Sequence, residues 1–178
     1  STFKLAGERH TFSTACSSSA MALGEAMRTI QAGRAEAIVA GGAEALLTPG
    51  TLAAWQAVRT LAPANAADAA ASCLPFDKRR AGLVLGEGAA AFVLEEEGHA
   101  RARGATIHAI LSGYGNSCDA VHMSRPDRDG QIRAMRDRAK EKWPGRLRGR
   151  AISAMRVLRT CDAMRPAPAG PGPAAPAM

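Results

Sequence analysis

The sequence TFSTACSSSA, from Thr11 to Ala20, places one cysteine between a β-prone run and a helix start. Threonine and phenylalanine before Cys16 favour extended backbone, and the serines after it suit the first turn of a helix. Cys16 is therefore expected at a strand-to-helix turn. Unpaired N–H groups and the helix dipole there favour a thiolate and could hold a developing oxyanion. A small buried structural cysteine is the alternative for the same residue.

An α/β fold is indicated by helical patterns that alternate with short apolar runs. Helices are predicted over residues 20–32, 52–61 and 95–103, strands over 11–14, 37–40, 89–94 and 106–114, and polar loops over 63–72 and 117–129. The 37–40 run is apolar on both faces, so it is interpreted as the second half of a parallel β-α-β unit. Gly41 and Gly42 after it allow close backbone approach or a positive φ. A phosphate loop is disfavoured, because these glycines lack the G-x-G-x-x-G and G-K-[ST] patterns.

The composition fits one globular domain without a membrane span or a metal site. Hydrophobic residues make up 47% of the 178 residues, and no apolar run reaches the roughly 18 residues of a membrane helix. The N-terminus has no signal-peptide pattern. The four cysteines and four histidines are scattered without metal-ligand spacing, so no metal is expected and the cytoplasm is the expected compartment.

The positive charge lies at one end of the chain. Residues 1–137 hold 14 basic and 14 acidic residues, whereas residues 138–178 hold 9 basic and 2 acidic residues, which accounts for the net charge of +7. A nucleic-acid-binding domain is therefore not expected. Residues 166–178 are almost wholly Pro, Ala and Gly, and the whole segment 138–178 is expected to be a disordered tail.

Three further charged residues are candidates for a site. Glu87 lies between two glycines and could be catalytic, but a buried carboxylate held by backbone N–H groups is the favoured interpretation. Asp119 and His122 lie in the polar loop, and with Cys16 they would complete a triad.

A family resemblance emerges from short motifs that stand in the order and spacing of β-ketoacyl synthases. They are Ser13-Thr14-Ala15-Cys16-Ser17-Ser18-Ser19, Ala40-Gly41-Gly42-Ala43-Glu44, Pro75-Phe76-Asp77, Gly86-Glu87-Gly88-Ala89, Leu94-Glu95-Glu96, Arg103-Gly104-Ala105, Gly113-Tyr114-Gly115 and Asp119-Ala120-Val121-His122-Met123. The chain most resembles the β-ketoacyl-[acyl-carrier-protein] synthase II branch of the thiolase-like superfamily. The resemblance covers roughly residues 5–137, so 1–137 is expected to be a partial β-ketoacyl synthase N-terminal domain.

The resemblance implies a partial thiolase-like fold and an acyltransferase of fatty-acid or polyketide chain elongation. It implies that Cys16 takes an acyl chain from a carrier-protein thioester. Malonyl carrier protein then loses CO₂, and the carbanion attacks the acyl-enzyme. The backbone N–H of Cys16 is implied as an oxyanion donor. Acyl carrier protein and a second subunit of a homodimer are the implied partners; the substrates are carried on phosphopantetheine, and no separate cofactor is expected.

The sequence departs from the family in its C-terminal part. The family's two histidines handle decarboxylation, and the first, in an Asn-Ala-His-Gly-Thr type motif, should fall near position 156. Here that region reads Ser153-Ala154-Met155-Arg156-Val157. His122 matches a family position to which the resemblance gives no catalytic role, so the triad is disfavoured. Condensation by this chain is not expected, and an inactive truncated fragment or a module that dimerises near Thr11 is the alternative.

The resemblance stops abruptly after Asp137, and an Arg/Pro/Ala/Gly-rich segment follows. A GC-rich gene read in a shifted frame gives such a segment, so a frameshifted or truncated gene product is the hypothesis. Reading the encoding DNA in the other two frames past codon 137 tests it. A His-Gly-Thr motif in neither frame would contradict it.

Overall fold

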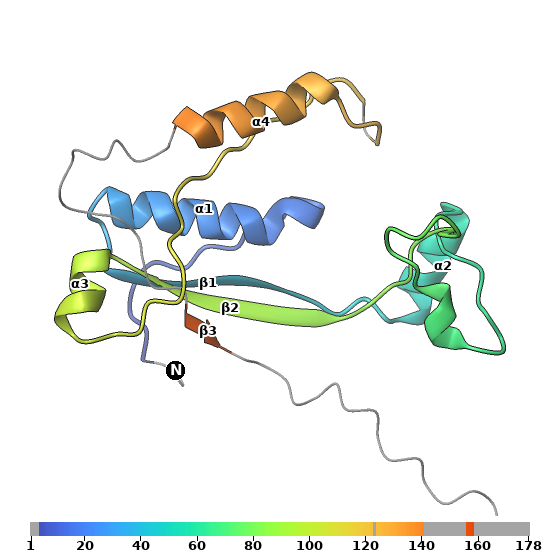
Figure 1. Cartoon of the computed structure of the whole chain (residues 1–178), viewed down its shortest axis with the longest axis horizontal. Helices are drawn as coiled ribbons and strands as arrows, with labels where there is room; N and C mark the ends of the chain where they lie inside the picture. Colours follow the sequence, from blue (N-terminus) through green and yellow to red (C-terminus); the bar gives the residue numbers. More distant parts are fainter. Residues whose placement is uncertain (1–3, 123, 141–155, 159–178) are drawn as a thin grey trace, which may run out of the picture.

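The computed structural model describes residues 4–122, 124–140 and 156–158. Its elements are, in chain order, η1 (Ala15–Ser17), α1 (Ser18–Gln31), β1 (Ala37–Glu44), α2 (Pro49–Ala57), η2 (Ala69–Ser72), β2 (Gly88–Glu95), α3 (Glu97–Ala102), α4 (Arg128–Lys140) and β3 (Arg156–Leu158). The three strands form one sheet in the order β1-β2-β3, and α1 lies over one face of it. In Figure 1, α3 lies at one end of the long strands and α2 lies beyond the other end.

The two long strands pair antiparallel over their full lengths, from Ala37 opposite Glu95 to Glu44 opposite Gly88. β3 pairs with the other edge of β2 and is also antiparallel. The interpretation of residues 37–40 as the second half of a parallel β-α-β unit is wrong, because residues 11–14, which would be its first strand, form no strand. The run is also not buried on both faces, since Val39 is 44% exposed. An unbroken apolar run indicates burial but does not fix strand direction, and here the chain reverses through α2 and η2 before it returns as β2.

Helix α1 packs on the sheet through the apolar face that the sequence predicts. Met27 and Ile30 are fully buried, at 0% and 1% exposure, and Leu23 packs beside them one turn earlier. They meet Ala40 of β1 and Leu94 of β2, which are also buried. Burial of each large side chain is worth about 1.5–3 kcal/mol, so this small cluster is what holds the helix to the sheet.

Two glycines let the layers approach closely. A Cβ added to Gly42 of β1 would lie 2.7 Å from the Cβ of Ser19 on α1. Gly24 on the same helix lies directly against the ring of Tyr114. The prediction of close backbone approach near Gly42 is confirmed, and its φ is not positive.

The segment between β1 and β2 forms a separate lobe around α2. The hydroxyl of Thr48 accepts the N–H of Thr51 at 3.4 Å, and Pro49 is the first helical residue, so the helix begins earlier than the predicted residue 52. It ends at Ala57 rather than at 61, and Arg59 follows with a φ of 58°. The predicted loop 63–72 contains the short helix η2 at its end.

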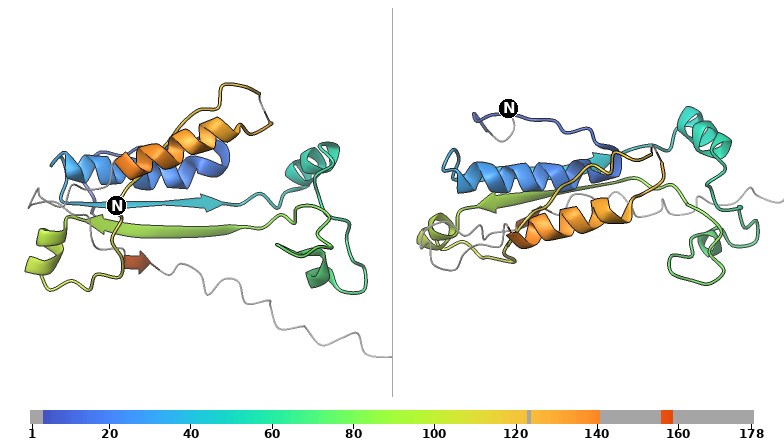
Figure 2. Two further views of the ribbon diagram at one scale, coloured as in Figure 1. Left: turned by 45° about the horizontal axis from the view of Figure 1, so that its top comes forward. Right: turned by 90° about the horizontal axis from the view of Figure 1, so that it is seen from above.

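Two predicted strands are absent from the described residues. Residues 11–14 lead into η1 without pairing to a strand. Residues 106–114 are irregular chain in the segment that runs from α3 to α4 (Figures 1 and 2). Both have β-prone sequences, but a strand also needs a neighbouring backbone to bond with. Instead, Leu111 and Tyr114 pack their side chains against the α1–sheet core.

The C-terminal part of the described chain is more regular than predicted. α4 begins inside the expected loop 117–129, where the carboxylate of Asp127 accepts the N–H of Gly130 at 2.8 Å. Of the expected tail 138–178, residues 138–140 end α4 and 156–158 form β3, so the tail is not wholly irregular. The other tail residues lie outside the described ranges, and the domain boundary at 137 stays a prediction.

A buried carboxylate joins the end of β2 to helix α3. Glu95 is 1% exposed and accepts two hydrogen bonds from the guanidinium of Arg103, at 2.7 and 2.6 Å. Nδ1 of His99 lies 2.5 Å from the same carboxylate. The Arg103 hydrogen bonds hold the pKa of Glu95 below its usual value, with a smaller contribution from His99, while burial opposes the shift.

The contact between Gly42 and Ser19 predicts a steric cost. Gly42→Ala should lower the free energy of unfolding by about 1–3 kcal/mol, because the added methyl group forces α1 away from β1. Gly88→Ala is the matched control, since that strand glycine has nothing within 4 Å of an added Cβ. Urea denaturation followed by circular dichroism measures both; equal stabilities of the two variants would contradict the packing argument.

The Glu95 cluster predicts pH-dependent stability. Because the folded-state pKa of Glu95 lies below the usual value of a glutamate carboxyl, the stabilisation is complete above that usual value and is lost as the pH falls through the folded-state pKa. Glu95→Gln should cost about 1.5–3 kcal/mol at pH 7 and progressively less below pH 4.5. Glu97→Gln, which breaks the exposed pair with Arg101 on the same helix, should cost at most about 0.5 kcal/mol. Urea titrations between pH 3 and 7 test this, and a pH-independent loss in Glu95→Gln would refute it.

Candidate active site: the turn at Cys16

Cys16 lies in the middle of η1, immediately before α1, and its side chain is exposed. In Figure 1, α1 begins at its dark-blue end, next to η1. The predicted place at a helix start is therefore confirmed, and a buried structural cysteine is not what the structure shows. The residues before it are irregular chain rather than a strand.

The turn is held by hydroxyl groups. The Ser18 hydroxyl accepts the N–H of Thr14 at 2.8 Å and donates to the carbonyl of Ala15 at 2.7 Å. The Ser17 hydroxyl donates to the Thr14 carbonyl at 2.9 Å. These bonds hold Ala15 at a φ of 50°, a left-handed conformation that costs a non-glycine residue roughly 1–2 kcal/mol.

The start of α1 lies beside the thiol and has a simple cap. Ser17 is the N-cap of α1, but its side chain makes no capping bond. The N–H of Ser18 donates to the carbonyl of Ala15, and the first turn carries the positive end of the helix dipole. A thiol beside a helix N-terminus is an arrangement found in enzymes that form a covalent intermediate on cysteine.

The other candidate residues from the sequence, Glu87, Asp119 and His122, form hydrogen bonds that stabilise local structure. The carboxylate of Glu87 accepts the N–H of Leu47 at 2.9 Å, which agrees with a carboxylate held by backbone, but Glu87 is exposed and not buried as predicted. It joins the chain after β1 to the chain before β2, because the two segments leave the sheet side by side.

Asp119 and His122 are engaged within their own loop. Asp119 accepts the N–H of Asp127 at 2.8 Å. Nδ1 of His122 accepts the N–H groups of Ser124 and Arg125, each at 3.1 Å. Within the described part of the chain, no hydrogen bond joins either side chain to Cys16.

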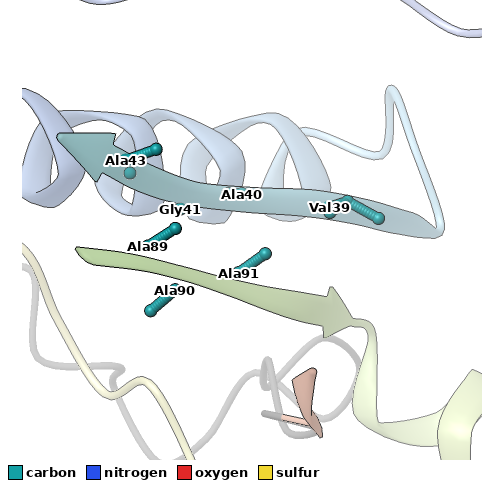
Figure 3. Close-up of a pocket in the computed structure, with 8 residues that line it drawn as sticks. Val39, Ala40, Gly41, Ala43, Ala89, Ala90 and Ala91 are labelled. Carbon is teal, nitrogen blue, oxygen red and sulfur yellow. The ribbon is translucent and has the colours of Figure 1, made fainter. Parts of the chain in front are cut away.

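An apolar groove of about 330 Å³ runs along strands β1 and β2 of the sheet (Figure 3). It is lined by Val39, Ala40, Gly41, Gly42, Ala43, Ala89, Ala90 and Ala91. None of these side chains can donate a proton or act as a nucleophile. The groove therefore offers apolar surface and no catalytic group.

The described residues also bear on the predictions about metals and membranes. Among residues 4–122, 124–140 and 156–158, no three His, Cys, Asp or Glu side chains converge on a point that would hold a metal ion. Across the same ranges, no helix has the length and apolar character to cross a bilayer. Cys73 and Cys118 are exposed free thiols like Cys16, and Cys161 lies outside the described residues.

The sequence did not reveal the role of Ser18. Three consecutive serines indicate a helix start, but they do not show which hydroxyl turns back to the preceding residues. Serine side chains near helix starts commonly bond to backbone groups three or four residues away, and this tendency is the only signal that the sequence contained.

Comparison with known proteins places the chain in a family. Residues 1–100 match the family model described as beta-ketoacyl synthase, N-terminal domain. The chain belongs to the β-ketoacyl synthases, a family of acyltransferases. It is 48% identical over 126 residues to 3-oxoacyl-[acyl-carrier-protein] synthase 2 of Vibrio harveyi, which covers 71% of this chain and 30% of that protein.

Solved ketosynthases share the fold. A β-ketoacyl synthase from Burkholderia phymatum matches with a TM-score of 0.62 and 41% identity, over 71% of this chain and 30% of that one. A type II polyketide ketosynthase (AntDE:AntF), in complex with its acyl-carrier protein and bound to a hexaketide, matches with a TM-score of 0.67 and 33% identity, over 78% and 35% of the two chains. The thiolase-like α/β fold is thus confirmed, and the chain spans about 30% of the length of its curated relatives.

Because Asp119 and His122 form hydrogen bonds within their own loop, we expect Cys16 to react without a histidine partner. In a background with Cys73, Cys118 and Cys161 changed to serine, His122→Ala should leave the rate of Cys16 alkylation by iodoacetamide within about twofold between pH 5 and 10. The reason is that Nδ1 of His122 accepts backbone N–H groups in place of a carboxylate partner and, among the described residues, no hydrogen bond joins this side chain to Cys16. His108→Ala is the matched control. A tenfold loss, or a displaced pH profile in the His122 variant alone, would restore the triad.

Proposed function

We propose that this chain accepts an acyl group on Cys16 from the thioester of an acyl carrier protein, as the first half-reaction of β-ketoacyl synthesis. The observation that supports the proposal is the exposed Cys16 thiol in a hydrogen-bonded turn at the start of α1. Family membership supports the reaction class, and the exposed position of Cys16 in the turn supports its proposed role as the nucleophile.

In this half-reaction the thiolate sulfur of Cys16 attacks the thioester carbonyl carbon, and a tetrahedral oxyanion forms. The backbone N–H of Cys16 is the proposed donor to that oxyanion. The intermediate collapses as the bond to the phosphopantetheine sulfur breaks. That sulfur leaves as a thiolate and takes a proton from water, and the acyl group remains on Cys16.

The proposed partners follow from the relatives. A structural relative was solved in complex with its acyl-carrier protein, and we propose the same class of partner for this chain. A homodimer formed through the segment near Thr11 is proposed on the family resemblance. The substrate is carried by the partner, so no further cofactor is proposed. The free cysteines Cys16, Cys73 and Cys118 accord with a cytoplasmic setting.

The second half-reaction is proposed to lie beyond this chain. Decarboxylation of malonyl carrier protein uses two histidines in the family, and the sequence has no counterpart of their motif. The described residues around Cys16 bring no histidine to it by a hydrogen bond. We therefore assign acyl transfer to this chain and no condensation. For the complete protein of this family, the proposed role is chain elongation in fatty-acid or polyketide synthesis.

Incubation with an acyl-loaded carrier protein tests the proposal. Intact-mass and peptide analysis should find one acyl adduct on Cys16 and none on Cys73 or Cys118, although all three are exposed. Cys16→Ala is the control and should remain unmodified. Addition of malonyl carrier protein should give no β-ketoacyl product. The absence of any Cys16 adduct would favour the non-catalytic alternative, and a condensation product would contradict the division of the two half-reactions.

A further inference from the structure

The turn contains a residue whose hydrogen bonds bear on the orientation of the proposed oxyanion donor. The Ser18 hydroxyl donates to the carbonyl of Ala15 at 2.7 Å, and the backbone N–H of Ser18 donates to the same carbonyl. The Ser18 oxygen also accepts the N–H of Thr14 at 2.8 Å. One side chain therefore bonds to the backbone on both sides of Ala15.

The carbonyl of Ala15 and the N–H of Cys16 belong to one peptide group. That group is planar, and the described chain contains no cis peptide bond, so the two point in opposite directions. The carbonyl of Ala15 points toward Ser18 in the first turn of α1. The N–H of Cys16 consequently points away from Ser18, out of the helix start.

This orientation depends on a conformation that Ala15 does not favour by itself. Its φ of 50° lies in the left-handed region, which non-glycine residues occupy only when the surrounding structure holds them there. Without the Ser18 hydroxyl, one donor to the Ala15 carbonyl and the acceptor for the Thr14 N–H are both lost. The backbone N–H of Ser18 still bonds to the Ala15 carbonyl, but the peptide group before Cys16 is held more weakly against rotation toward the favoured region.

We propose that Ser18 is a positioning residue that aims the Cys16 N–H at the oxyanion formed when Cys16 is acylated. The inference rests on the proposed function in one respect, namely that Cys16 is the acyl acceptor. Ser18 itself touches neither the thiol nor a substrate in this role. It acts through the peptide group between Ala15 and Cys16.

The proposed role of Ser18 affects one reaction of the Cys16 thiol and not another. Acylation by p-nitrophenyl acetate passes through a tetrahedral oxyanion, whereas alkylation by iodoacetamide is a displacement at carbon without one. Both need the Cys16 thiolate, so the ratio of their rates at one pH cancels any change in thiolate fraction. A misaligned N–H lowers acylation alone, because it serves only the oxyanion.

The test uses the full chain with Cys73, Cys118 and Cys161 changed to serine, and the ratio of acylation to alkylation rate at Cys16 is the readout. Ser18→Ala should lower the ratio about tenfold or more, as removal of an oxyanion donor lowers turnover by 10²–10³ in known enzymes. Ser18→Thr keeps the hydroxyl and should restore the ratio to within about twofold, because the hydrogen bond can re-form. Ser19→Ala is the matched control, since the Ser19 hydroxyl makes none of the turn's hydrogen bonds.

A second variant guards against loss of folding. Ser18→Asp places a carboxylate at the start of α1, which favours the helix, and it accepts the Thr14 N–H but cannot donate to Ala15. It should fold with unchanged circular dichroism and show the same low ratio as Ser18→Ala. An unchanged ratio in Ser18→Asp, an equal effect in Ser19→Ala, or no recovery in Ser18→Thr would overturn the inference. Neither reagent needs a carrier protein, so failure of carrier-dependent acylation would count against the proposed function alone.

Discussion

The close approach of helix α1 to strand β1 is the contact on which the rest of this structure depends. Met27 and Ile30 are buried against the sheet, and Gly42 lets the first turn of the helix come down onto the strand beside Ser19. Since Cys16 immediately precedes that turn, the packing that stabilises the helix also fixes where the thiol lies. Stability and the candidate site are therefore not separable at this end of α1.

The elements with strong local signals could be predicted from the sequence. The periodic apolar face of α1, the apolar strand β2 and the charge pattern of α3 each contain enough information within their own residues. Residues 11–14 and 106–114 do not. Their β propensity is real, but strand formation is decided by a neighbouring backbone, which a local pattern cannot reveal. Strand direction escaped prediction for the same reason.

Helix α4 is the reverse case: it forms, but the sequence did not predict it. Its residues form no strong apolar stripe, and the preceding segment is polar with a proline at 126. The helix begins where Asp127 accepts the N–H of Gly130, while Asp119 accepts the N–H of Asp127. The start of α4 thus depends on a pair of carboxylates, one of which also appeared as a catalytic candidate. Asp119 thus belongs to a residue type that is common in active sites, but here it stabilises local structure.

The chemistry available at the Cys16 turn follows from the groups that it contains. From Thr11 to Ala20 there is no charged side chain, and the groups placed by the structure are a thiol, hydroxyls and backbone amides. Neutral donors of fixed orientation can stabilise an oxyanion, because they need no reorganisation as charge develops. Loss of CO₂ creates a carbanion that needs its own stabilising groups, and amides committed to the thiol's acyl group cannot serve both. The turn is thus suited to the proposed acyl transfer, and the proposed reaction of a malonyl unit requires a second set of groups.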